Sequence, residues 1–130
     1  MKILIDSDIL IEILRGRNEA VLTQWIALAE AGTASLYSPI SAAEIWGGAF
    51  PHEHALIARI FRPLHCVADD AETGKKAGDF LRQFQKSHGL KLGDAMIASA
   101  SVQNHALLWT RNRKHFPMPE LTFFTQNDAK

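Results

Sequence analysis

Apolar residues along the chain follow two patterns, and the shorter pattern predicts β-strands. Five short segments are rich in apolar residues and end at polar residues, glycine or proline, which is typical of strands buried on both faces of a sheet. The predicted strands are residues 2–5 (KILI), 35–38 (SLYS), 64–68 (LHCVA), 106–110 (ALLWT) and 121–125 (LTFFT). We expect these segments to form one sheet.

The longer pattern repeats apolar residues every three to four positions and predicts helices between the strands. Apolar residues at 9, 10, 13 and 14 before Gly16 predict a helix directly after the first strand, and a second predicted helix runs from about 19 to 31. Ser41 and Glu44 have the spacing of a capping box at a helix start. Further predicted helices are residues 52–61, 69–88 and 93–105.

The alternation of predicted strands and helices indicates an α/β fold. Strands joined through helices form right-handed crossovers, so we expect a three-layer α/β/α domain with a mostly parallel, about five-stranded sheet. The chain has 130 residues, and we expect residues 1–130 to form one domain, since a domain of this size buries roughly two-thirds of the unfolded surface. In such folds ligands bind outside the carboxyl ends of the strands.

Composition and charge narrow the classes of protein to consider. Apolar residues make up 47% of the chain, and Lys+Arg and Asp+Glu both number 14, so no net charge attracts nucleic acid at long range. Any RNA partner must therefore be held by a local basic patch. Cys66 is the only cysteine; we expect it in a buried strand, and it excludes an internal disulfide. No run approaches the roughly 18 to 20 apolar residues of a membrane span, so we expect no membrane partner and a cytoplasmic location.

Acidic residues follow the predicted strands at positions where a parallel sheet would bring them together. Asp6 and Asp8 follow the first strand, Glu44 lies early in the helix after the second, and Asn112 follows the fourth. Asp94 opens a predicted helix, although no strand directly precedes it. Crowded carboxylates raise one another's pKa unless a cation compensates, and Mg²⁺ or Mn²⁺ prefers such oxygen ligands. The set therefore predicts metal-assisted hydrolysis of a phosphodiester.

Each acidic residue also has a purely structural interpretation. Asp94 and Asp8 could be helix N-caps, Glu44 could complete the Ser41 capping box, and Asn112 could occupy a turn. Asp6 is the hardest to explain in this way, because a carboxylate gains little from directly ending an apolar strand. The catalytic interpretation therefore depends on the whole set.

With these motifs in view, the chain resembles the PIN-domain nucleases, and most closely the VapC-like toxins of bacterial toxin–antitoxin pairs. ILIDSDILIEIL resembles the opening strand, Asp and helix of that family, and SPISAAEIWGGA resembles its second motif, with Glu44 in the acidic position. LGDAMIASASVQNHALLWTRNRKHF resembles the third and fourth motifs together. The order of the four motifs and the chain length both fit the family.

The resemblance implies a PIN-like fold and Mg²⁺-dependent cleavage of RNA, with Mn²⁺ as a substitute. Asp6 and Asp94 would be direct metal ligands, and Glu44 would act directly or through water. The implied partners are a structured RNA such as tRNA or rRNA, a second copy of the chain in a homodimer, and a VapB-like antitoxin. Asn112 matches the fourth acidic position, and the matching positions with supporting roles are Ser7, Asp8 and Thr110.

Two departures from the family pattern concern the closing motif. Asn112 is neutral where an acid is common, which puts a second metal ion in doubt, and His115 replaces an Asp that often precedes the Phe of this motif. Basic residues beside Asn112 are placed where an RNA backbone would need cations. These candidates for RNA binding are Arg111, Arg113, Lys114 and His115.

Three alternatives compete with the nuclease. A haloacid-dehalogenase-like phosphatase also opens with a strand and Asp-x-Asp, here Asp6 and Asp8, but GDAMIASA lacks the further acid that its later motif needs, and the chain is short for that fold. A receiver-like phosphoacceptor could use Asp69 or Asp70, but no predicted strand ends in the required lysine. A non-catalytic PIN-like domain that binds RNA or protein is favoured only by Asn112.

Overall fold

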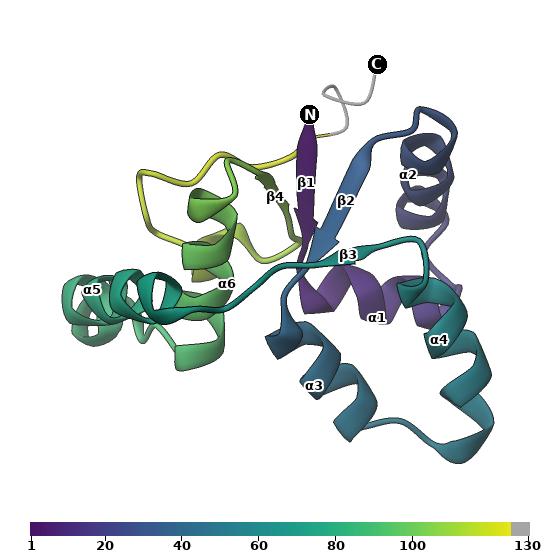
Figure 1. Cartoon of the computed structure of the whole chain (residues 1–130), viewed down its shortest axis with the longest axis horizontal. Coiled ribbons are helices and arrows are strands. Elements are labelled where there is room, and N and C mark those ends of the chain that lie inside the picture. The colour runs from purple at the N-terminus through teal and green to yellow at the C-terminus, as the bar shows by residue number, and fades with distance from the viewer. Residues whose placement is uncertain (126–130) are drawn as a thin grey trace.

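The computed structural model describes residues 1–125, which form a parallel sheet between two layers of helices (Figure 1). The strands are β1 (Lys2–Ile5), β2 (Ala34–Tyr37), β3 (His65–Cys66) and β4 (Leu107–Trp109). The α-helices are α1 (Ser7–Arg15), α2 (Glu19–Glu30), α3 (Pro39–Gly47), α4 (His54–Phe61), α5 (Ala71–His88) and α6 (Leu92–Gln103), and the short 3-10 helices are η1 (Pro51–Glu53) and η2 (Arg113–His115). The α/β prediction is confirmed.

The strand order β3-β2-β1-β4 creates a topological switch point beside β1. From β1 the chain builds outward through β2 to β3, and then returns to place β4 on the other side of β1. All three strand pairs are parallel. Ligands bind at the carboxyl edge of such a switch point, which here lies between the residues after Ile5 and those after Trp109.

Two details of the strand prediction were wrong: the fifth strand does not form in full, and the third strand is shorter than predicted. Residues 121–125 form only an isolated bridge, Leu108 to Phe123, instead of a full strand. The third strand is limited to His65 and Cys66 at the edge of the sheet, where, among the described residues, β2 is the one strand that pairs with it. Cys66 is exposed there, so the expectation of a buried cysteine was also wrong.

Each face of the sheet has its own hydrophobic core. Ile3 and Ile5 pack with apolar residues of α1, α2, α3 and α4, whereas Leu4 packs on the opposite face with residues of α5 and α6. This alternation follows from the two-residue period of a strand. All three residues are completely buried, which explains why the first strand is apolar throughout.

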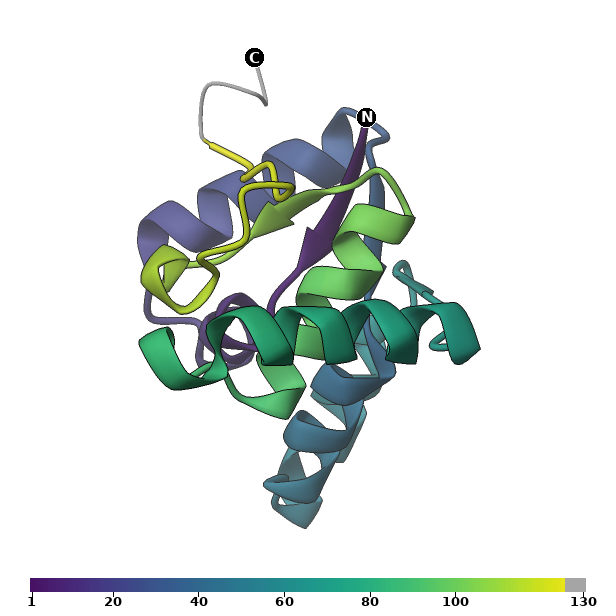
Figure 2. The same ribbon diagram turned by 90° about the vertical axis from the view of Figure 1, so that its left-hand side faces the viewer.

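The helices α3 and α4 extend beyond the carboxyl edge of the sheet, whereas the N-terminus lies at the opposite edge (Figure 1; Figure 2, α3 and α4 in blue to teal). The helix α3 begins at Pro39 with Ser38 as its N-cap, so the predicted Ser41–Glu44 capping box was wrong. Ser41 and Glu44 are therefore free to make contacts with other elements. No helix within residues 1–125 has the length and apolar character that spanning a membrane requires.

Candidate active site

Asp6 lies at the switch point and is held by hydrogen bonds on both carboxylate oxygens. It is the N-cap of α1, where Oδ1 accepts a hydrogen bond from the Ser7 backbone N–H (2.8 Å), and Oδ2 accepts one from Thr110 Oγ1 (2.8 Å). Only 6% of Asp6 is exposed. Burial, and next the negative charge of Asp8, raise the pKa of Asp6 to about 7.

Glu44 reaches the same edge from α3 through the hydroxyl of Ser7. Ser7 Oγ donates to Glu44 Oε1 over 3.0 Å and lies 2.8 Å from Ser41 Oγ. Both serines are buried, and the pair joins the first turn of α1 to α3. Ser41 is a site residue that the sequence interpretation missed, because its spacing to Glu44 favoured a local capping role.

Asp8 and Asn112 join the first turn of α1 to the turn after β4. Asp8 Oδ2 accepts hydrogen bonds from the Arg111 backbone N–H (2.9 Å) and from Asn112 Nδ2 (3.1 Å). The Asn112 backbone N–H donates to Thr110 Oγ1 over 3.0 Å, and the same hydroxyl donates to Asp6. Asp8 is therefore no N-cap, and Asn112 has a defined partner in addition to its place in a turn.

Asp94 approaches these residues from the first turn of α6. The N-cap of that helix is Lys91, so the capping interpretation of Asp94 was wrong. A Cβ added at Gly93 would lie 3.6 Å from Ile40 Cγ2, which places the start of α6 against the start of α3. Burial raises the pKa of Asp94, and the negative charges of Glu44 and Asp8 raise it further. His115, 3.9 Å away, acts in the opposite direction and lowers it.

The charge on this edge is compatible with a bound cation. Burial and like charge raise the pKa values of Asp6 and Asp94, and Asp8 Oδ1 is buried without a hydrogen-bond partner. Within residues 1–125, no three His, Cys, Asp or Glu side chains are placed to hold a metal ion by themselves. Mg²⁺ does not need such a cage, since it binds through one or two carboxylates and retains several waters. The donor set therefore fits a hard divalent cation.

The basic residues after β4 have different surroundings. Arg111 forms an ion pair with Glu12 (3.3 Å), and His115 lies beside Asp94. The Arg113 guanidinium donates to the Phe124 carbonyl (3.3 Å) and lies 5.1 Å from the centre of the Phe123 ring, so it anchors the C-terminal segment. Lys114 is exposed. Of the four candidates, Arg113 is the one whose side chain donates a hydrogen bond to a backbone carbonyl.

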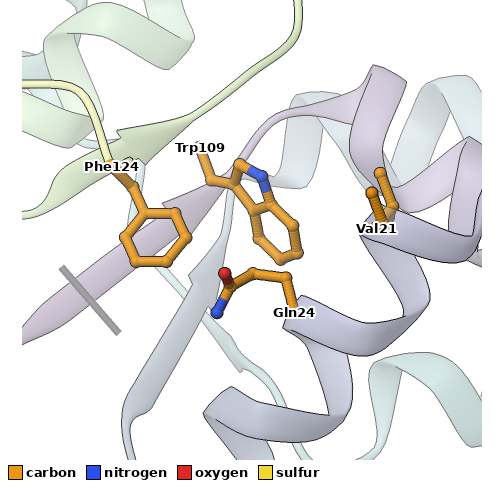
Figure 3. Close-up of a pocket in the computed structure, with 5 residues that line it drawn as sticks. Val21, Gln24, Trp109 and Phe124 are labelled. Carbon is orange, nitrogen blue, oxygen red and sulfur yellow. The ribbon is translucent and has the colours of Figure 1, made fainter. Parts of the chain in front are cut away.

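A hollow between α2 and the edge of the sheet lies apart from the acidic residues and is lined by uncharged residues (Figure 3). Its cavity of about 160 Å³ is lined by Ala20, Val21, Gln24, Trp109 and Phe124. The two aromatic rings pack edge to face with centres 5.5 Å apart. None of these residues carries a charge, so this hollow offers no carboxylate to a cation.

The acidic residues thus come from three separate parts of one chain and Asn112 from a fourth, and comparison with known proteins identifies the arrangement. The model of the PIN domain family matches residues 3–119. The chain belongs to the PIN domain family. Ribonuclease VapC10 of Mycobacterium tuberculosis is 34% identical to it over 119 residues, which is 91% of this chain and 88% of that protein. The family assignment agrees with the resemblance of the sequence motifs.

Solved structures share the fold of this PIN domain. VapBC2 from Rickettsia felis, bound to a DNA fragment from its promoter, matches with a TM-score of 0.81 and 21% identity, covering 95% of this chain and 98% of that chain. FitAcB from Neisseria gonorrhoeae matches with a TM-score of 0.76 and 23% identity, covering 95% and 96%. At such identities the likeness concerns the fold alone.

The structure and the family assignment weaken two alternatives, the haloacid-dehalogenase-like phosphatase and the receiver-like phosphoacceptor. Membership of the PIN domain family accounts for the Asp6-x-Asp8 motif without a phosphatase. Asp70 is the N-cap of α5 and accepts a hydrogen bond from the Thr73 backbone N–H (3.1 Å), which explains it structurally. Asp69 follows a strand of only two residues, at the edge of the sheet away from the switch point.

Proposed function

We propose that this PIN domain is a Mg²⁺-dependent endoribonuclease, active also with Mn²⁺, and the toxin of a VapBC-type toxin–antitoxin pair. The observation that carries the proposal is the network from Glu44 through Ser7, Asp6 and Thr110 to Asn112, with Asp94 beside it. The similarity to a protein named a ribonuclease supports RNA as the substrate. The RNAs that we propose as substrates, tRNA or rRNA, lie in the cytoplasm, where we expect the chain to act.

In this proposal Asp6 and Asp94 are the direct ligands of the cation, and Glu44 acts directly or through water. Bound Mg²⁺ would supply positive charge that stabilises the transition state of phosphodiester hydrolysis. Ser7 and Thr110 fix the Asp6 carboxylate on both oxygens, so that its orientation is set before substrate binds. Asp6 is ionised at neutral pH once a cation is present, because opposite charge lowers its pKa.

Asn112 has a positioning role in this proposal. Its amide donates to Asp8, and its backbone N–H donates to Thr110. A neutral side chain here leaves one carboxylate fewer for cations, which favours a single metal ion over two. Asp8 is then a supporting residue, whose Oδ2 accepts hydrogen bonds from the Arg111 backbone N–H and from Asn112 Nδ2.

The partners that we propose are a structured RNA, such as tRNA or rRNA, a second copy of the chain and a VapB-like antitoxin. Arg111, Lys114 and His115 lie on the surface around the acidic edge and would contact the RNA backbone. A pocket that contains Glu44 is also lined by apolar residues of α1 and by Phe50, which is 64% exposed. This exposed apolar surface beside the site supports a protein partner.

The test is RNA cleavage by the purified chain with Mg²⁺, with Mn²⁺ and with EDTA. We expect cleavage only with a metal ion, and a loss of at least about a hundredfold in Asp6→Asn and Asp94→Asn, as for removal of a group that stabilises the transition state. Asp79→Asn is the matched control, because Asp79 lies on α5, has a side chain that is 42% exposed, and pairs with Arg82. Cleavage of equal rate in all four proteins would contradict the proposal.

Two further readouts distinguish the alternatives. Metal-dependent release of phosphate from a phosphomonoester, without RNA cleavage, would indicate a phosphatase. RNA binding without cleavage under any metal condition would indicate a non-catalytic PIN domain. Growth arrest on expression, relieved by a small protein encoded alongside, tests the toxin assignment.

A further inference from the structure

A polar pocket lies directly beside the acidic edge, on the outer side of α1. Its cavity of about 390 Å³ is lined by Asp8, Ile11, Glu12, Arg15, Arg111 and Asn112. This volume is within the usual range for ligand pockets. Asp8 and Asn112 belong to both the pocket and the acidic network. An RNA strand that crosses the proposed cleavage site would therefore place the neighbouring nucleotides in this pocket.

Two guanidinium groups in this pocket converge on a single carboxylate oxygen. Arg111 Nη1 lies 3.3 Å from Glu12 Oε1, and Arg15 Nη1 lies 3.7 Å from the same atom. The arginine side chains are 50% and 62% exposed, whereas that of Glu12 is only 18% exposed. Both cations are therefore accessible from solvent, and the oxygen at which they meet lies deeper in the pocket.

We propose that this pocket binds a phosphate of the RNA backbone, and that the phosphate replaces Glu12 as the partner of Arg15 and Arg111. Guanidinium groups bind phosphate oxygens by charge-assisted hydrogen bonds, and two of them already share one anionic oxygen here. Arg111 and Arg15 are then positioning residues, which hold the substrate beside the metal site. The inference rests on the proposed function for its choice of RNA.

The exposure of the two arginine side chains allows a phosphate to replace Glu12, although Asp8 and Glu12 also line the pocket. Solvent screens the charge of the two arginines and so weakens their ion pairs with Glu12, which a more highly charged ligand can therefore displace. Arg113 is excluded from this role, because its guanidinium is bonded to the Phe124 carbonyl. The inference thus divides the basic cluster after β4 into one substrate-binding and one structural arginine.

The test measures binding of an end-labelled single-stranded RNA by fluorescence anisotropy in EDTA, which prevents metal-dependent cleavage. We expect Arg15→Ala and Arg111→Ala to weaken binding about tenfold each, the effect of a hydrogen bond to a charged group. Each should also lower the slope of log affinity against log salt by about 0.7. Arg17→Ala is the matched control, since Arg17 is an exposed arginine outside the pocket.

Glu12→Gln tests the exchange of partners. Loss of the competing carboxylate should tighten RNA binding by about two- to fivefold, as expected for the loss of exposed ion pairs. This gain should shrink in the Arg111→Ala background, where Glu12 competes only for Arg15, and disappear when Arg15 and Arg111 are both replaced by Ala. Weaker binding by Glu12→Gln would overturn the exchange.

The outcomes separate this inference from the proposed function. Wild-type cleavage of RNA, together with equal RNA affinities of the Arg15, Arg111 and Arg17 variants, would overturn the pocket and leave the nuclease intact. Selective loss of affinity in the pocket variants without any cleavage by the wild type would support the pocket and contradict the nuclease. A polyglutamate peptide that displaces RNA at equal charge concentration would assign the pocket to an acidic protein partner instead.

Discussion

The buried carboxylate of Asp6 should destabilise the metal-free protein at neutral pH, and Asp6→Asn should remove that cost. The amide has nearly the same shape as the carboxylate and can keep both contacts, accepting from the Ser7 backbone N–H and donating to a lone pair of the Thr110 hydroxyl. The substitution therefore removes the charge while largely preserving the packing. We expect the variant to be more stable than the wild type in EDTA at pH 8.

The size of the effect follows from the pKa of Asp6, which burial and Asp8 raise from 3.8 to about 7. Below about pH 4 the carboxyl group is protonated in both the folded and the unfolded chain, so its ionisation does not change the free energy of unfolding. Between about pH 4 and 7 the folded chain keeps the proton and the unfolded chain loses it, so stability falls as pH rises. At 1.36 kcal/mol per pH unit, the total cost above pH 7 is on the order of 4 kcal/mol.

The assay is urea unfolding of both proteins in EDTA at a series of pH values from 4 to 8. The difference in unfolding free energy should be small at pH 4 and grow to a few kcal/mol at pH 8 in favour of Asp6→Asn. Asp79→Asn should differ from the wild type by less than about 1 kcal/mol, because Asp79 forms an exposed ion pair. A pH-independent difference, or a less stable Asp6→Asn at pH 8, would refute the reasoning.

Three other substitutions test the supports of the site and the core. Thr110→Val should lower the unfolding free energy by about 1–3 kcal/mol and slow RNA cleavage, because it removes the donor to Asp6 and the acceptor for Asn112; unchanged kcat would contradict the positioning role. Phe80→Ala should cost about 3–5 kcal/mol in urea unfolding, since Phe80 is 1% exposed. Gly16→Ala should lower stability by about 1 kcal/mol, because residue 16 has φ +66°; an unchanged unfolding midpoint would contradict this.

The sequence predicted the elements that carry their own local signals. Strong apolar runs located β1 and β4, and glycines with positive φ end α1 and α5 where the pattern predicted it. The strand β3 was predicted too long, because LHCVA is apolar enough for a strand but has a partner on one side only. Its edge position depends on the assembled sheet and leaves no mark in the local sequence.

The site was predictable as a set of acids, whereas its connections were not. The carboxyl-edge rule placed Asp6 and Glu44 together, yet the contact between them runs through Ser7, 37 residues before Glu44 in the chain. The bond between Asp8 and Asn112 spans 104 residues. Such contacts depend on the distance between elements after folding, which a single sequence does not encode in any spacing.

Asp6 connects the stability of the fold with the proposed chemistry. A carboxylate that costs free energy in the metal-free protein becomes favourable when a cation occupies the site, so metal binding should stabilise the wild type. Asp6→Asn should gain little from the same metal ion. Asp6→Asn should therefore raise the stability of the metal-free protein and abolish its activity with metal. Such a trade-off between stability and activity is common at active sites.

The central claim is that acids from separate parts of the chain form one metal site, and a crystal structure soaked with Mn²⁺ tests it most directly. The account predicts a single anomalous peak at the carboxyl edge, within about 2.0–2.3 Å of a carboxylate oxygen of Asp6 and of Asp94. A peak that contacts neither residue, or an empty edge in crystals of protein that cleaves RNA with Mn²⁺, would contradict the claim.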